Sequence, residues 1–341
     1  MTSSFKSSFF LPLTLGILLL LVASVRLMRT DPADGAASLT VYSGRSEDLI
    51  QPLLDRFEEK TGITLQVRYG QTAEMAATIL EEGANSPADI FFAQDAGALG
   101  ALAQAGRFAP LPMPLLERVS PRFRSPSHHW VGVSGRARVL VYNPDRVDPE
   151  ELPDDLTELC TPEWAGRVGW APANGSFQAF VTAMRVTLGE EAARSWLACM
   201  RDNRTRSYAK NTPIVVAVDA GEIDIGLVNH YYLHAMQRER RTAMNIKNHY
   251  PSSSVLANVA GVGVIDTSTN QAQARAFIEF LLSETAQRYF TDETFEYPLV
   301  PDIPAHSALP ALHTMDTPDM DLSELDDLQQ TLERLQELGI L

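Results

Sequence analysis

The chain has 341 residues, of which 45% are hydrophobic and 21% are charged, a composition typical of a folded globular protein. The formal net charge is −15 at pH 7, and basic residues form no stripe along the sequence, so we expect no nucleic-acid partner. This length allows two domains or one unit with two lobes.

The N-terminus is typical of an export signal. Lys6 precedes an apolar run over residues 9–25, which matches the charged and apolar regions of a secretory signal peptide. Cleavage after Ser24 or after Ala37 would satisfy the preference for small residues, and an uncleaved membrane anchor is the alternative. We therefore expect residues 1–37 to be a signal peptide or anchor plus a linker, and the remainder to be extracytoplasmic.

The two cysteines, Cys160 and Cys199, could form a disulfide in an oxidising, exported compartment. Two separate buried thiols are the alternative, because a sequence spacing does not show whether the Cα atoms lie within bridging distance. Neither cysteine has the neighbours of a catalytic nucleophile, and their spacing matches no zinc motif.

Strand and helix patterns alternate directly after the export signal. Gly62 ends the first helix, and Ile63, Leu65 and Val67 alternate along the second strand. This rhythm predicts a parallel sheet covered by helices. The expected strands span 38–42, 63–69 and 88–92, and the expected helices span 47–61, 72–82 and 96–105.

Two long apolar runs, over residues 130–142 and 255–265, are interpreted as crossings between two lobes, because the first exceeds the length of a typical strand. The fold class is therefore α/β with two lobes, each a mostly parallel sheet flanked by helices, and a ligand-binding cleft between them. The expected lobe limits are 38–134 for the first part of lobe 1, 135–254 for lobe 2 and 255–341 for the second part of lobe 1. Later elements are expected as strands over 168–171 and 223–228, and as helices over 176–188, 190–201, 213–220, 271–290 and 321–339.

Tyr231 and Tyr232 are adjacent at the point where the strand over 223–228 gives way to a helix-like pattern. Open α/β sheets bind ligands at such junctions, and irregular backbone allows two successive side chains to converge. Two phenolate oxygens suit a hard, highly charged metal ion, for which ferric iron is the candidate. Packing of both rings in the core is the alternative.

Short motifs follow one another in a specific order. They are VYSGR at 41–45, FEEKTGI at 57–63, EGANSPAD at 82–89, SGRARV at 134–139, YNP at 142–144, GEID at 221–224 and NHYY at 229–232. In this order the chain resembles the periplasmic ferric-ion-binding proteins that deliver iron to ABC importers, within the bilobal solute-binding-protein fold. The resemblance covers nearly everything after residue 38. It implies a periplasmic, non-catalytic, monomeric protein that docks on an inner-membrane ABC permease.

The resemblance implies that Tyr231 and Tyr232 bind Fe(III) as phenolates. Positions near a synergistic anion, carbonate or phosphate, correspond to Arg136, Gly175, Ser176, Asn211 and Asn229. Arg136 could instead form a salt bridge between the lobes. Gly175 and Ser176 could equally be an ordinary helix N-cap.

The chain departs from the family's metal-binding pattern at several positions. Ser46 follows Arg45 where several members have a histidine, and Gln94 stands where some have a glutamate. A third tyrosine of certain members is replaced by Asn174 or Phe177. Tyr69, at the end of the second strand, is the best substitute ligand, followed by Asp95 and Tyr42, although Tyr69 could also be a packing residue.

Because the expected metal-binding set is incomplete, the same scaffold could bind another small solute, such as thiamine, a polyamine or an organic anion. An enzyme is disfavoured, since the sequence contains no nucleophile–base arrangement, no zinc signature and no glycine-rich phosphate loop. A membrane-tethered sensor is also disfavoured, because no signalling module follows the binding region.

Overall fold

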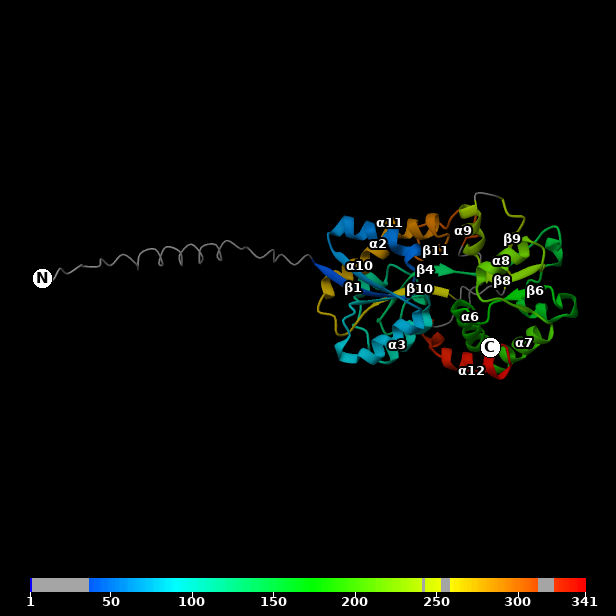
Figure 1. Cartoon of the computed structure of the whole chain (residues 1–341), viewed down its shortest axis with the longest axis horizontal. Helices are drawn as coiled ribbons and strands as arrows, with labels where there is room; N and C mark the ends of the chain where they lie inside the picture. Colours follow the sequence, from blue (N-terminus) through cyan, green and yellow to red (C-terminus); the bar gives the residue numbers. More distant parts are fainter. Residues whose placement is uncertain (2–36, 241–242, 253–257, 312–321) are drawn as a thin grey trace. The chain divides into compact units, whose positions relative to one another are not determined.

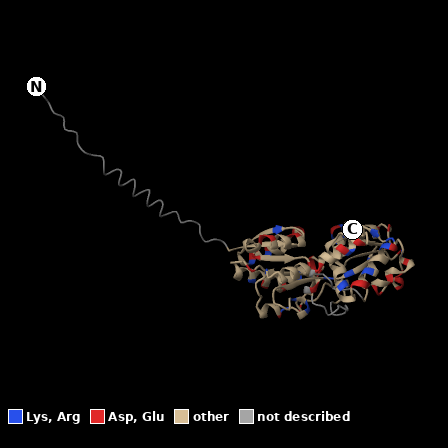
Figure 2. Cartoon of the chain, turned by 90° about the horizontal axis from the view of Figure 1, so that it is seen from below, with Lys and Arg blue, Asp and Glu red and all other residues tan. Residues whose placement is uncertain are grey.

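The computed structural model describes residues 1, 37–240, 243–252, 258–311 and 322–341. Ser38–Leu341 form one compact unit that contains two β-sheets with helices packed on them (Figure 1). The expected export signal lies outside the described residues. Within the described part, no helix is long and apolar enough to cross a membrane. Acidic and basic residues are interspersed along the described elements (Figure 2).

The first sheet has six strands in the order β11-β4-β10-β3-β1-β2. β1 pairs in parallel with β2 and β3, as the alternating pattern predicts. β10 pairs antiparallel with β3 and β4, and β11 pairs antiparallel with β4, so the sheet is mixed. The strands are β1 (Ser38–Ser43), β2 (Thr64–Tyr69), β3 (Ile90–Ala93), β4 (Val131–Arg136), β10 (Asn258–Val264) and β11 (Tyr297–Pro298).

Helices of this part begin and end close to the expected positions. Helix α2 ends at Gly62, whose positive φ of 71° suits a residue without a Cβ, and its face with Leu53 and Phe57 is buried. The helix expected over 271–290 is divided, because Ser283 caps a new helix. The elements are α2 (Glu47–Thr61), α3 (Thr72–Glu82), η1 (Gly83–Asn85), α4 (Ala96–Gln104), α5 (Met113–Leu116), η2 (Pro121–Phe123), α10 (Gln271–Leu281), α11 (Glu284–Arg288) and η6 (Tyr289–Glu293).

The second sheet has five strands in the order β7-β6-β8-β5-β9, again with parallel and antiparallel pairs. Its strands are β5 (Arg138–Tyr142), β6 (Val168–Trp170), β7 (Arg206–Ser207), β8 (Ile225–Asn229) and β9 (Lys247–His249). Its helical elements are η3 (Pro149–Glu151), η4 (Leu156–Cys160), η5 (Pro162–Trp164), α6 (Gly175–Leu188), α7 (Glu190–Asp202), α8 (Asn211–Asp219) and α9 (Tyr231–Arg240). The α/β fold class with two sheets is therefore confirmed.

The chain passes from the first sheet to the second at Ala137. β4 and β5 are consecutive strands on either side of this residue, and they belong to different sheets. The crossing expected over 130–142 is thus confirmed. The expected return run begins within residues 253–257, which lie outside the described residues, and β10 itself belongs to the first sheet.

The C-terminal segment, residues 322–341, contacts helices of both sheets. Its first element, η8 (Leu322–Asp326), packs on α4, where a Cβ on Gly97 would collide with the carbonyl oxygen of Leu325. Its second element, α12 (Leu328–Glu337), packs on α6. There, the hydroxyls of Thr182 and Thr331 lie 2.8 Å apart, and Arg185 Nη1 donates to the Asp327 carbonyl at 2.9 Å.

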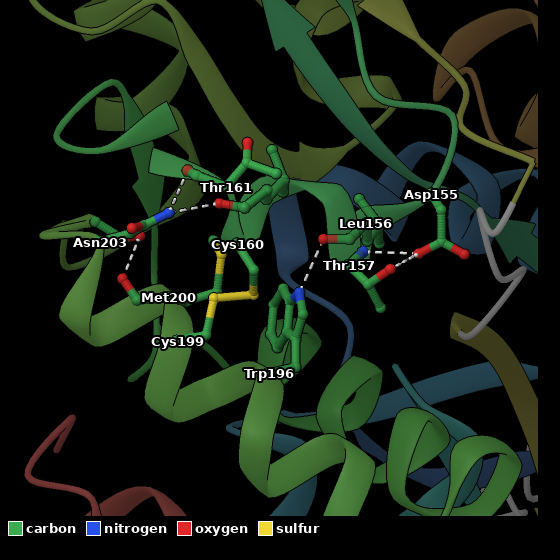
Figure 3. Close-up of a disulfide and its surroundings, with 11 residues drawn as sticks. Asp155, Leu156, Thr157, Cys160, Thr161, Trp196, Cys199, Met200 and Asn203 are labelled. Carbon is green, nitrogen blue, oxygen red and sulfur yellow. Dashed lines mark hydrogen bonds between the residues drawn. A yellow bond between two sulfur atoms is a disulfide. The ribbon is translucent and has the colours of Figure 1, made fainter. Parts of the chain in front are cut away.

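Cys160 and Cys199 form a disulfide between the end of η4 and helix α7, with 5.5 Å between their Cα atoms (Figure 3). Of the two possibilities left open by the sequence, the structure has the paired one. Asn203 reinforces the same junction, because its amide nitrogen donates to the carbonyls of Leu159 and Thr161 at 2.9 and 2.8 Å. The disulfide therefore ties an irregular loop to a regular helix of the second sheet.

Candidate functional site

The adjacent tyrosines begin helix α9, two residues after strand β8 ends at Asn229. Both are partly exposed, and their rings stack with centroids 4.4 Å apart and planes inclined by 25°. Neither ring is fully buried, although Tyr232 packs against the edge of the core. Burial of its hydroxyl, together with the neighbouring Tyr232, raises the pKa of Tyr231 well above its usual value. Tyr231 is thus a neutral phenol at neutral pH until a cation displaces its proton.

His230 fixes the start of α9 against the crossing between the sheets. Its backbone N–H donates to the Ala137 carbonyl at 3.0 Å, and the Ala137 N–H donates to its Nδ1 at 3.1 Å. Its Nε2–H donates to the Phe295 carbonyl at 2.6 Å, just before β11. The ring is fully buried and neutral, because burial lowers its pKa to about 4.

Arg136 is anchored to the first sheet. Its Nη2 donates to the Gln94 carbonyl, and its Nε lies 3.7 Å from a carboxylate oxygen of Glu296. Arg136 therefore forms an ion pair within the first sheet, and not the expected salt bridge between the lobes. Nε and Nη1 of this buried side chain nevertheless have no hydrogen-bond acceptor among the described residues, so the salt bridge leaves room for an anion contact.

Glu296 is the centre of a buried ion network. Arg45 donates to both of its carboxylate oxygens, at 2.9 and 2.8 Å, and Ser134 Oγ donates at 2.8 Å. Burial alone would raise the pKa of Glu296, but Arg45, Arg136 and Ser134 hold it below its usual range. The carboxylate is therefore charged and fully occupied, and it acts as a structural group.

The N-terminus of α6 holds a second set of polar groups. Asn174 caps the helix, since its Oδ1 accepts from the Ser176 N–H at 3.0 Å and from the Ser176 hydroxyl at 2.5 Å. The helix start is thus capped by Asn174, and Gly175 and Ser176 are the first two residues of the helix, not its cap. Gly175 is exposed, and a Cβ there would meet no atom within 4 Å. Asn211 Nδ2 lies 3.3 Å from the Ser176 hydroxyl, which joins the starts of α6 and α8.

Arg138 approaches the same helix start from β5. Its Nη2 donates to the carbonyl and the hydroxyl of Ser176, at 2.5 and 3.3 Å. Burial lowers its pKa to about 10, while the nearby Tyr232 and Tyr231 hydroxyls favour its charged form. Arg138 is therefore a cation at neutral pH in the immediate electrostatic environment of the tyrosine pair.

Buried polar atoms without a hydrogen-bond partner occur on several candidate-site residues and their neighbours, as well as elsewhere in the described chain. Each such atom costs about 1–3 kcal/mol, so a group of them indicates a ligand that completes their contacts. On the candidate-site residues and their neighbours, within the described part of the chain, the atoms concerned are Nε and Nη1 of Arg136 and of Arg138, Oε1 of Gln94, Oδ1 of Asn211, and both polar side-chain atoms of Asn229. Most of these atoms are N–H donors of guanidinium or amide groups, and such donors suit an anion.

The suggested substitute ligands have other partners. The Tyr69 hydroxyl donates to Gln51 Oε1 of α2 at 2.6 Å, and burial raises the pKa of Tyr69 to about 12. The Tyr42 hydroxyl donates to Glu82 at 2.8 Å. Asp95 caps α4 by accepting from the Ala98 N–H at 3.3 Å. A metal-binding role for Tyr69 therefore stays a prediction, and its contact with Gln51 is that of a packing residue.

Among the described residues, no group of three His, Cys, Asp or Glu side chains could hold a metal ion. Sequence reasoning missed Arg138, His230 and Glu296. Arg138 lies two positions after Arg136 in the SGRARV motif, and that spacing was the available signal.

Residues 85–322 match the family of bacterial extracellular solute-binding proteins. The chain belongs to this family. It is 32% identical over 335 residues to a Fe(3+)-binding periplasmic protein of Serratia marcescens, covering 96% of this chain and 98% of that protein. It is also 32% identical to the major ferric iron-binding protein of Neisseria meningitidis, covering 89% and 93% of the two chains.

Solved structures of the same family share the fold. Iron-bound HitA from Pseudomonas aeruginosa superposes with a TM-score of 0.83 at 32% identity, covering 89% of this chain and 99% of that one. A Trichodesmium protein in complex with iron and citrate gives a TM-score of 0.78 at 30% identity, with 89% and 99% coverage. The family resemblance inferred from the sequence motifs is therefore confirmed.

Proposed function

We propose that this protein is the extracytoplasmic component of an ABC importer, and that it binds ferric iron together with a synergistic anion. The observation that carries the proposal is the stacked tyrosine pair at the start of α9, together with arginine and asparagine side chains whose buried polar atoms lack hydrogen-bond partners. The names of the relatives, which are ferric-iron-binding proteins, support the same function. The protein binds and delivers iron without a chemical step.

Tyr231 and Tyr232 provide the iron-binding oxygens. A free phenol has a pKa of about 10, and burial raises the pKa of Tyr231 further, so metal-free protein holds this proton tightly. A trivalent cation reverses this preference because it stabilises the phenolate directly. Iron binding therefore releases protons and weakens in acid.

A small oxyanion, carbonate or phosphate, completes the site. Arg136 offers N–H groups from the first sheet, and Asn229 offers its amide N–H from the second, while Asn211 holds the Ser176 hydroxyl in place. The start of α6 at Gly175 and Ser176 adds backbone N–H groups and the positive end of the helix dipole. Contacts from both sheets to one ligand favour a closed arrangement, which an inner-membrane permease then recognises.

Visible spectroscopy combined with elemental analysis tests this function. Protein loaded with ferric citrate and bicarbonate is expected to show a phenolate-to-iron charge-transfer band and to retain iron. The band and the iron are expected to disappear in the Tyr231→Phe/Tyr232→Phe variant, and loading without bicarbonate or phosphate is expected to weaken both.

Tyr142→Phe/Tyr208→Phe is a matched control, because it removes two tyrosine hydroxyls from the same half of the molecule outside the site. This control is expected to keep its colour and its iron. A colourless wild-type protein that binds thiamine, a polyamine or an organic anion would replace iron with that solute as the cargo.

A further inference from the structure

Arg138 is a buried cation without a carboxylate partner. Its side chain is about 1% exposed, and none of the ion pairs between described residues includes it. Its guanidinium is held by Ser176 and lies over the ring of Phe180, with Cζ 5.5 Å from the ring centroid. Nε–H and Nη1–H have no acceptor among the described residues. A buried charge without a partner costs free energy, and a negative group that binds beside Arg138 would offset this cost.

Arg136 and Arg138 are separated by one residue but are held by different sheets. Arg136 ends β4 and contacts Gln94 and Glu296 of the first sheet. Arg138 begins β5 and contacts Ser176 of the second sheet. Arg138 therefore keeps its position relative to α9 when the two sheets move against each other, whereas Arg136 does not.

The strand register places Arg138 at the tyrosine pair. In the antiparallel pairing of β5 with β8, Arg138 stands opposite Asn229, and Tyr231 begins α9 two residues later. Both tyrosine hydroxyls act electrostatically on Arg138. Phenolates formed on iron binding would place negative charge within this electrostatic range of Arg138, while Arg136 acts on Tyr231 from the first sheet.

We propose that Arg138 is a positioning residue that supplies the fixed counter-charge for the two tyrosinate ligands of iron. This inference rests on the proposed function, because the tyrosinates form only when a cation binds. Arg138 does not contact the metal in this role. It lowers the free-energy cost of holding two adjacent phenolate oxygens at the start of α9. This effect is the same whichever anion completes the site.

The test measures iron affinity by competition, in bicarbonate, phosphate and citrate, together with the melting temperature of iron-free protein. Arg138→Met is expected to lower the affinity by about 10- to 100-fold, the size of a lost hydrogen bond to a charged group. The loss is expected to be the same with each anion. The iron-free protein is expected to melt at an equal or higher temperature, because an unpaired buried charge has been removed. Arg138→Lys, which keeps the charge, is expected to recover part of the affinity.

Arg185 provides the matched control. It is also buried, but it is paired with Glu190 and Asp327 at 2.6 and 2.9 Å. Arg185→Met is expected to lower the melting temperature and to leave iron affinity unchanged. Arg138→Gln gives the same comparison should Arg138→Met fail to fold.

Three outcomes overturn the inference while leaving the proposed function intact. The first two are unchanged iron affinity in a coloured Arg138→Met variant, and a loss of affinity that occurs with only one of the anions. A lower melting temperature of the iron-free variant would also overturn it, because Arg138 would then be structural. A wild-type protein without iron colour is a different result, since it rejects the proposed function itself.

Discussion

Two groups of buried polar side chains lie on either side of Ala137, and they differ in how well they are paired. On the first sheet, Glu296 is bound by Arg45 and Ser134, and both of its oxygens have partners. On the second sheet, Arg138 and Asn229 retain polar atoms without partners. Arg136 belongs to both descriptions, because it pairs with Glu296 but keeps Nε and Nη1 without a hydrogen-bond partner. We therefore expect Glu296 and its partners to contribute mainly to stability, and Arg138 and Asn229 mainly to ligand binding.

The largest expected effect comes from removing the centre of the paired group. Glu296→Ala leaves two buried arginines without their carboxylate, and we expect it to lower the free energy of unfolding by about 3–5 kcal/mol. Urea unfolding of iron-free protein measures this. Glu293→Ala is the control, because its pair with Arg238 is half exposed, and a loss of less than about 1 kcal/mol is expected. Equal losses in the two variants would contradict the comparison.

The second effect concerns pH and His230. The folded protein resists protonation of His230 down to about pH 4, whereas the unfolded chain takes up that proton near the ordinary value of 6.5. Stability is therefore expected to fall as the pH drops from 6.5 to 4, by about 3 kcal/mol from this residue. Glu296 adds to the loss in stronger acid, because its folded pKa is depressed.

His230→Gln is expected to flatten the stability curve between pH 6.5 and 4. The control is His128→Gln, which changes an exposed residue and is expected to follow the wild-type curve. Denaturant unfolding at several pH values measures both variants. Identical curves for His230→Gln and wild type would show that some other group produces the dependence.

The smallest expected effect on stability comes from the unpaired group. Asn229→Leu replaces a fully buried amide that has no partners, so iron-free stability is expected to change by less than about 1 kcal/mol or to rise. Iron affinity is expected to fall in the same variant. Unfolding and iron competition on one preparation measure both quantities. A large loss of iron-free stability would place Asn229 among the structural residues instead.

Local patterns predicted the regular elements of this fold well. Helix α2 was expected from its apolar face and from Gly62, and both its limits are confirmed. Strands β7, β9 and β11 were not expected, because segments of two or three residues are too short to show a period. Antiparallel pairing of β10 and β11 depends on where the chain returns, which no local pattern records.

The candidate site was predicted only in part, because local sequence patterns show adjacent residues but not contacts between distant ones. The tyrosine pair is visible because its two residues are adjacent, and the family resemblance gave Arg136 its expected role. The ion pair of Arg45 with Glu296 joins positions 251 residues apart, and no local sequence pattern around either residue predicts it. Arg138 was missed because its significance lies in the absence of a partner, which only coordinates reveal.

The C-terminal segment limits how the two sheets can move. Leu325 is fixed over Gly97 of α4, and two residues later Asp327 is fixed to Arg185 of α6. The chain also passes between the two sheets at Ala137, the single residue that separates β4 from β5. The last helix of the chain is therefore joined to elements of both sheets, so a movement of one sheet against the other would have to keep or break the contacts of Leu325 and Asp327.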